Sequence, residues 1–202
     1  MTTKFSRFAF LFLLVGLGFT FTSCDDDSPQ AEETPEAITQ VKLTFALPNG
    51  AQVVATATSD DGETNFRFNP SVIELTKGLT YTLNMEFTNQ LTDPDEDITE
   101  EIKEEADEHQ IFFTGTALGS VFTNTTTNYQ DEEQDYVADG CTGCTGSNAP
   151  VGLSTSWTVV GTANNTGTLK VQLKHQPDGQ KNGIITSGED DVNLDFSLKV
   201  ID

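Results

Sequence analysis

Two histidines, and the carboxylates beside one of them, are the residues of this chain best suited to binding a metal ion. His109 ends an acidic segment, with Glu105 four positions and Glu108 one position before it, and His175 lies 66 residues further along. On a helix, Glu105 and His109 would share one face, because residues four apart are neighbours there. Imidazole nitrogen and carboxylate oxygen bind Zn²⁺ or Cu²⁺, and carboxylates also bind Ca²⁺. One interpretation is therefore a divalent-cation site shared by Glu105, Glu108, His109 and His175.

Both histidines also have an interpretation that needs no metal. His109 continues an apolar stripe that starts at Ile98, and His175 follows the alternating segment 168–174. A histidine at the end of an apolar face is satisfied by a hydrogen bond to the backbone or to a carboxylate. The sequence separation does not decide whether the two side chains meet, so both interpretations stay open.

The acidic segment 93–108 predicts a helix rather than a calcium loop. It holds ten acids and one lysine, and Asp97 followed by Glu100 is a capping-box pattern. Apolar residues recur every four positions from Ile98, so we expect one short acidic helix at about 98–108 with a narrow apolar face. Ile98 also stands where an EF-hand loop needs glycine, which disfavours that kind of calcium site.

Cys141 and Cys144 form a C-x-x-C pair within a long acidic segment, 124–150. Such a pair can be a redox centre, half of a zinc site or a small disulfide. No helix pattern follows it, and only acids or a distant histidine could complete a zinc site, so we expect a disulfide. The sequence contains neither Gly-x-Ser-x-Gly nor His-Glu-x-x-His, and no pair of acids stands out. We therefore expect no enzymatic activity and assign no catalytic residue.

Residues 1–23 have the organisation of a secretory signal, with a short basic start and then an apolar run at 8–21. That run is shorter than the roughly 20 apolar residues that a membrane-spanning helix needs, so it does not predict one. The Thr-Ser pair before Cys24 resembles the lipobox of bacterial lipoproteins, in which the cysteine is lipidated. Secretion with a free Cys24 is the alternative. We expect lipidation at Cys24 and a disordered acidic tether over residues 24–40.

Alternation of apolar and polar residues dominates the remaining chain. It is clearest at 41–47, 79–87, 168–174 and 192–200, and weaker at 51–58, 64–68, 72–75, 110–116 and 154–160. A period of two predicts strands with one buried face, which are typical of antiparallel sheets. We therefore expect an all-β fold, an antiparallel β-sandwich of immunoglobulin-like type, with Trp157 in its core. A closed up-and-down barrel is the alternative.

The charge of the chain bears on its partners. Lys4 and Arg7 are the only charged residues of the signal segment, so the remainder holds eight basic residues against 32 acids, a formal charge of −24. Nucleic acid would be repelled by such a chain, which argues against that partner. Residues 41–202 are enough for a single domain with a core, and no internal repeat suggests a second one.

Five segments spread over residues 40–202 share a pattern with a known group of proteins. They are YTLNMEF (81–87), EDITEEIKEEADEHQIFF (96–113), VGLSTSWTV (151–159), GTLKVQLKHQPDG (167–179) and DVNLDFSLKV (191–200). Together they resemble small flavobacterial-type exported lipoproteins labelled "type 1 periplasmic binding fold superfamily protein". That label names a two-lobed α/β structure, whereas the alternation in this chain predicts a sandwich with one helix. The resemblance implies a place near TonB-dependent outer-membrane receptors, and the acids after Cys24 resemble a surface-export signal.

From these patterns we expect a lipid-anchored binding or accessory lipoprotein of the outer membrane, on its periplasmic face or at the cell surface. It would capture a ligand or a divalent cation for a TonB-dependent uptake receptor. The alternative is a structural or adhesive surface lipoprotein with no small-molecule site. The expected partners are the membrane, through the lipid on Cys24, and that receptor, and we expect no nucleic acid.

Overall fold

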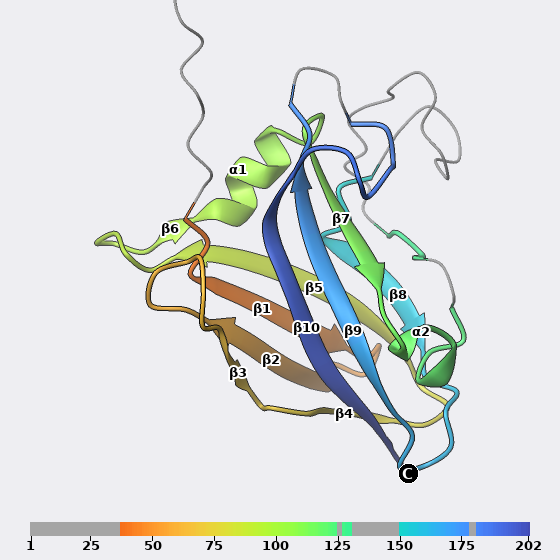
Figure 1. The fold of residues 1–202 in the computed structure, drawn as a ribbon. Helices are drawn as coiled ribbons and strands as arrows, with labels where there is room; N and C mark the ends of the chain where they lie inside the picture. Colours follow the sequence, from red (N-terminus) through yellow and green to blue (C-terminus); the bar gives the residue numbers. More distant parts are fainter. Residues whose placement is uncertain (1–36, 125–126, 131–149, 178–180) are drawn as a thin grey trace, which may run out of the picture. The chain divides into compact units, whose positions relative to one another are not determined.

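Two facing β-sheets form the folded part of the chain (Figure 1). The structure is a computed structural model that describes residues 37–124, 127–130, 150–177 and 181–202. The predicted signal at 1–23, Cys24, most of the tether, Cys141 and Cys144 all lie outside these residues. Residues Pro35–Asp202 form one compact unit, and Ile38 is already buried in it. The prediction of a mostly β fold with two layers is confirmed.

The first sheet is antiparallel and has six strands. Five follow the order β3-β2-β1-β5-β6, and β8 pairs with β5 on the same side as β6. Their bounds are β1 Gln40–Ala46, β2 Gln52–Thr58, β3 Arg67–Asn69, β5 Thr80–Asn89, β6 Glu96–Asp97 and β8 Ser154–Thr158. All but the two-residue strand β6 overlap segments in which the sequence pattern predicts a strand.

The second sheet has four strands in the order β4-β10-β9-β7. Their bounds are β4 Ile73–Thr76, β7 His109–Thr114, β9 Thr166–His175 and β10 Glu189–Ile201. Strand β4 runs parallel to β10, so the expectation of a purely antiparallel sandwich is wrong at this edge. Alternation specifies which face of a strand is buried and not the direction of its neighbour, so the pattern could not predict the parallel pair.

The core between the sheets is built from the alternating side chains. Along β10, the apolar residues at every second position from Val192 to Val200 are buried. Trp157 of β8 is fully buried, as predicted, and its ring centroid lies 5.6 Å from that of Phe113 on β7 in the other sheet. Burying a large apolar side chain contributes about 1.5–3 kcal/mol, so these contacts hold the two layers together.

Helix α1 is shorter than the sequence predicts. It spans Ile98–Glu104, a turn occupies residues 105–108, and His109 is already the first residue of β7. The expected start is confirmed, because the Asp97 carboxylate accepts a hydrogen bond from the Thr99 amide at 3.0 Å. The helix ends early because acids at its carboxyl end oppose the helix dipole and the chain joins the second sheet at His109.

The buried face of α1 attaches it to the first sheet. Thr99 accepts a hydrogen bond from the Phe87 amide and donates one to the Phe87 carbonyl on β5, and Ile102 is fully buried. A second short helix, α2 (Ala117–Ser120), was not predicted and follows β7. Within the described parts of the chain, no helix is long and apolar enough to cross a membrane.

Candidate metal centre

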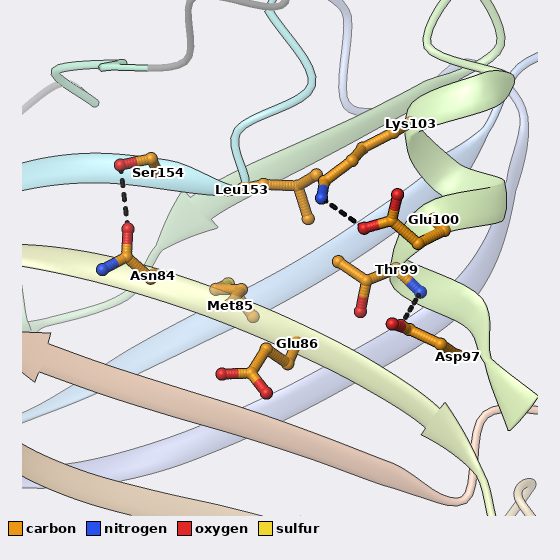
Figure 2. A pocket seen from close by; sticks show the side chains of 9 residues that line it. All are labelled: Asn84, Met85, Glu86, Asp97, Thr99, Glu100, Lys103, Leu153 and Ser154. Atoms are coloured by element: carbon orange, nitrogen blue, oxygen red, sulfur yellow. Dashed lines mark hydrogen bonds and ion pairs between the residues drawn. The ribbon is translucent and has the colours of Figure 1, made fainter. Parts of the chain in front are cut away.

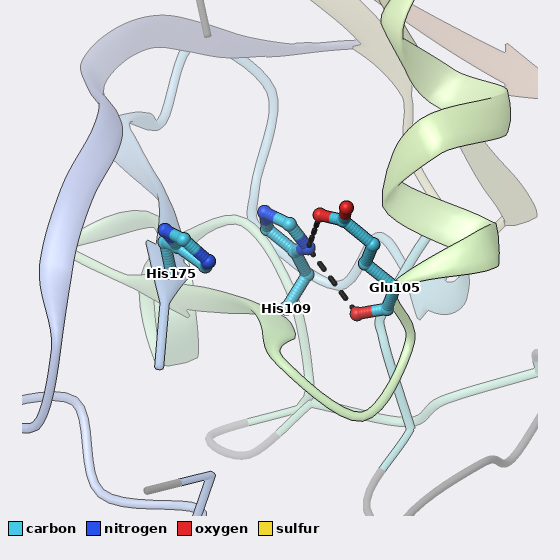
Figure 3. A group of neighbouring side chains, drawn as sticks. All are labelled: Glu105, His109 and His175. Carbon is cyan, nitrogen blue, oxygen red and sulfur yellow. Dashed lines mark hydrogen bonds and ion pairs between the residues drawn. The ribbon is translucent and has the colours of Figure 1, made fainter. Parts of the chain in front are cut away.

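The two histidines of the chain lie side by side. Strands β7 and β9 pair in a register that places His109 directly opposite His175. Their rings stack with centroids 4.8 Å apart and planes 10° from parallel (Figure 3). The 66-residue separation did not decide whether the two side chains meet. The pairing of β7 with β9 brings them together.

His109 is buried, and its ring is held from the turn after α1. Its Nδ1 atom lies 3.2 Å from the backbone oxygen of Glu105 and 3.8 Å from the Glu105 carboxylate (Figure 3). A carbonyl oxygen only accepts hydrogen bonds, so Nδ1 carries the ring proton in this contact. Burial, reinforced by the nearby charge of His175, lowers the pKa of His109 to about 4. The ring is therefore neutral at neutral pH.

His175 is half-buried and makes its own contact with a carboxylate. Its Nε2 atom lies 3.2 Å from the Glu108 carboxylate, and the Gln176 amide donates to the Glu108 backbone oxygen at 2.7 Å. When a carboxylate accepts from Nε2, the other ring nitrogen, Nδ1, holds the lone pair that can bind an ion. Glu108 is then placed to orient the His175 ring.

All four residues of the predicted metal group therefore come together. One ligand atom each from Glu105, His109 and His175 lies within 4.8 Å of the other two, and Glu108 contacts His175. The predicted reason was partly wrong, because Glu105 and His109 meet across a turn and not along one helix face. The turn nevertheless keeps the four-residue spacing, since the His109 amide donates to the Glu105 carbonyl at 3.1 Å.

The donor set fits a divalent ion only after the side chains move closer together. Zinc binds nitrogen and oxygen at about 2.0–2.2 Å, so two donors of a tetrahedral ion lie about 3.4 Å apart. The 4.8 Å spread must therefore shrink by about 1.4 Å. An ion also lies in the plane of each imidazole that binds it, so the stacked rings must rotate to share one. Two imidazoles with carboxylates favour Zn²⁺ or Cu²⁺ over Ca²⁺, which prefers oxygen alone.

Asp191 is a fifth residue at this place, which the sequence pattern did not indicate. Its carboxylate lies 3.7 Å from His109 Nε2, and its side chain is only 6% exposed. Strand alternation from Val192 predicts that Asp191 faces outward. A bulge between Asp190 and Val192 shifts the register and turns Asp191 inward. Burial raises the pKa of Asp191 to about 6, while the charge of His175 acts in the opposite direction.

Two lysines also lie close to the group. Lys181 is fully buried, and its ammonium donates to the backbone oxygen of Ala106 in the turn after α1. Its charge acts with burial to lower the pKa of His109. Lys174 forms an ion pair with Asp190 at 2.8 Å. These cations weaken the attraction for a metal ion but leave the carboxylates of Glu105, Glu108 and Asp191 around the histidines.

A separate groove lies between α1, β5 and the start of β8 (Figure 2). It has a volume of about 410 Å³ and a partly polar lining. Its polar groups bond to one another: Lys103 pairs with Glu100 at 2.6 Å, Asp97 caps α1, and Ser154 donates to Asn84 at 3.0 Å. The groove therefore presents less directed chemistry than the histidine group.

Comparison with known proteins gives no match, so the function is inferred from the geometry of the site. No protein-family model, curated protein or solved structure matches the chain. The resemblance to flavobacterial-type lipoproteins thus stays a prediction. What the structure contributes is a Glu105, His109 and His175 group, with His109 buried and the other two partly exposed, that could hold a metal ion.

Proposed function

We propose that this chain is a lipid-anchored binding lipoprotein that captures a divalent transition-metal ion in the group of Glu105, His109 and His175, with the two imidazoles as the common ligands. One observation carries the proposal: the β7–β9 register pairs the two histidines, with carboxylates against both rings. A pair of imidazoles, one buried and one half-buried, with acids nearby is suited to Zn²⁺ or Cu²⁺. The role is binding, without catalysis.

The location and partner in this proposal come from the amino-terminal pattern and the resemblance. A lipid on Cys24 would hold the protein at the outer membrane, on the periplasmic face or at the cell surface. A captured ion would be passed to a TonB-dependent uptake receptor. The formal charge of −24 after the signal segment supports capture, because a strongly acidic surface raises the local concentration of cations and repels nucleic acid.

Zinc titration by calorimetry tests the proposal. We expect one Zn²⁺ per chain, and we expect His109→Ala and His175→Ala each to weaken binding by at least about tenfold. Removing a group that only orients a ligand already weakens metal binding by about 10–100-fold, and removing a ligand itself should cost no less. Changing Cys141 and Cys144 to serine removes the thiols and should preserve this binding. Glu100→Gln, an acid of α1 paired with Lys103, is the matched control and should bind as the wild type does.

A second candidate function is a structural or adhesive surface lipoprotein without a small-molecule site. Both imidazoles have hydrogen-bond partners without an ion, namely the Glu105 carbonyl for His109 and the Glu108 carboxylate for His175. Under this alternative the stacked histidines only join β7 to β9. The absence of stoichiometric zinc binding, or equal affinity in wild type and both histidine variants, would favour it.

The finer class of the fold is also a proposal. We propose an immunoglobulin-like sandwich, supported by two facing sheets whose strands pair antiparallel except for β4 with β10. An experimental structure tests this through the order in which the chain connects the strands. Connections unlike those of immunoglobulin domains would place the chain in another class of β-sandwich.

A further inference from the structure

Asp191 is a buried carboxylate near the start of strand β10, where the neighbouring acids are exposed. It is the extra residue of the bulge in β10, since Asp190 pairs with Lys174 and Val192 pairs with Leu173. Its Oδ2 atom is buried and accepts no hydrogen bond from any residue that the structure describes. A buried acceptor without a partner loses its hydration, which costs about 1–3 kcal/mol. Such an arrangement needs a compensating contact.

The atom facing Asp191 cannot supply a hydrogen bond in the neutral ring. Nδ1 of His109 donates to the Glu105 carbonyl, so Nε2, 3.7 Å from Asp191 Oδ2, carries a lone pair. Two electron-pair donors therefore face each other in a buried place. A cation between them would satisfy both. A metal-bound histidine commonly has this arrangement, with its second nitrogen donating to a backbone carbonyl.

We infer that Asp191 is a ligand of the captured ion, which binds Nε2 of His109, while Glu105 orients the ring through its backbone carbonyl. This inference rests on the proposed function, because it concerns the same ion. It assigns Asp191 a direct role and gives Glu105 and Glu108 supporting roles. The ion is of the Zn²⁺ class, since its donors are two imidazoles and a carboxylate.

The separation of the two facing atoms suits one ion. With bonds of about 2.1 Å to nitrogen and to oxygen, a spacing of 3.7 Å gives an angle at the metal of about 124°, somewhat wider than the tetrahedral angle. The second imidazole is near this place, because the His175 ring stacks on the His109 ring with centroids 4.8 Å apart. His175 can join through Nδ1, since its Nε2 faces Glu108.

The backbone around Asp191 is also shaped for close approach. Gly188, just before β10, has a φ of +71°, and a Cβ atom there would lie 2.1 Å from the His175 carbonyl. Only glycine lets the two segments come this near without displacement. The bulge then directs Asp191 toward His109 instead of outward. Two local features thus place this carboxylate at the histidine pair.

Zinc calorimetry on two carboxylate variants separates the roles. We expect Asp191→Asn to weaken Zn²⁺ binding by about 10–100-fold or more, and Glu105→Gln, which keeps the backbone carbonyl, to weaken it less. Glu100→Gln serves again as the control. A loss in Glu105→Gln equal to or larger than that in Asp191→Asn would overturn the inference and leave the proposed function standing. Failure of the wild type to bind zinc would overturn the proposed function itself.

Cobalt spectroscopy tests direct contact even if Asp191→Asn alters the fold. In a chain with Cys141 and Cys144 changed to serine, Asp191→Cys places a thiol where the carboxylate was. Adding Co²⁺ should produce a thiolate-to-cobalt charge-transfer band in the near ultraviolet. The same background with Asp191 retained, and Asp190→Cys at the neighbouring position, should lack the band. Binding of Co²⁺ to Asp191→Cys without that band would show that residue 191 does not touch the ion.

Discussion

At the scale of single residues, burial and hydrogen bonding prepare His109 as a ligand. Burial lowers its pKa to about 4, so the ring is neutral over the physiological range. The Glu105 carbonyl accepts from Nδ1, so the lone pair is on Nε2. Metal ions bind the neutral ring, and an ordered ring loses less conformational freedom when an ion binds. The local structure therefore favours metal binding at one defined atom.

Asp191 should reduce the stability of the protein when no metal is present. Its Oδ2 atom is buried, without a hydrogen-bond partner among the described residues. In buffer containing a chelator, we expect Asp191→Asn to raise the free energy of unfolding by about 1–3 kcal/mol, since the amide removes a buried charge. Urea denaturation followed by circular dichroism measures this change.

Saturating zinc should reverse that order of stability. A ligand that binds only the folded state, at 100 times its dissociation constant, stabilises it by about 2.7 kcal/mol. Wild type should gain this stability, whereas Asp191→Asn should gain much less. An Asp191→Asn protein that is less stable than wild type in chelator would mean that the carboxylate has a structural partner and does not await an ion.

At the scale of elements, the register between β7 and β9 decides whether a site exists. His109 and His175 are cross-strand partners, and strand side chains alternate between faces. A slip of one residue would turn one histidine to the opposite face and separate the rings. The register is held by apolar residues of the same two strands, such as Ile111 opposite Leu173, which are fully buried. Core packing therefore positions the two histidines of the candidate site.

The turn between β2 and β3 allows an independent test of the structure by pH. The Asp61 carboxylate accepts hydrogen bonds from the Ser59 hydroxyl at 2.7 Å, from the amides of Glu63 and Thr64, and from the Thr64 hydroxyl. These bonds hold the pKa of Asp61 far below its usual value, with the bond from Ser59 the largest cause. The charged form is thus favoured in the folded protein.

We expect Asp61→Asn to lower the thermal midpoint at pH 7. The folded pKa is below the unfolded one, so the stabilisation is present above pH about 4 and is lost as pH falls further. The difference between wild type and Asp61→Asn should therefore shrink at pH 3. Circular dichroism melts at both pH values measure it, with exposed Asp95→Asn as control. A difference that does not change with pH would contradict the hydrogen-bonded turn.

The strands of this fold are predictable from alternation because burial of one face imposes a period of two. Each of the nine segments named from the pattern overlaps a strand. The end of α1 was harder to predict, since the sequence favours continued helix to 108 while pairing of His109 with β9 stops it at Glu104. The parallel β4–β10 pair was also unpredictable, because it depends on how the chain crosses between sheets.

The candidate site was predictable only in part, for physical reasons. His109, Glu105 and Glu108 are close in sequence, so their types and spacing indicated the chemistry. The approach of His175 depends on strand register, which is a tertiary property. Asp191 lies in a run of acids before an alternating strand, where the simplest pattern places it outward. Only the bulge turns it inward, and no sequence signal specified that bulge.

At the scale of the whole molecule, the acidic charge and the site act together in the account proposed here. Outside the signal segment, eight basic residues face 32 acids. Such a field attracts cations over roughly a Debye length, about 8 Å at physiological ionic strength, and the paired imidazoles would then provide selectivity. The proposed lipid on Cys24 would keep this capture at the membrane surface, where an uptake receptor could receive the ion.

The most direct test of the central claim is the X-ray absorption spectrum of the protein loaded with one equivalent of Zn²⁺. We predict scattering from two imidazole rings together with oxygen donors, at about 2.0–2.2 Å from the metal. Both imidazole contributions should disappear in the His109→Ala, His175→Ala double variant. A spectrum with only oxygen donors, or with sulfur at about 2.3 Å, would contradict the claim that the paired histidines hold the ion.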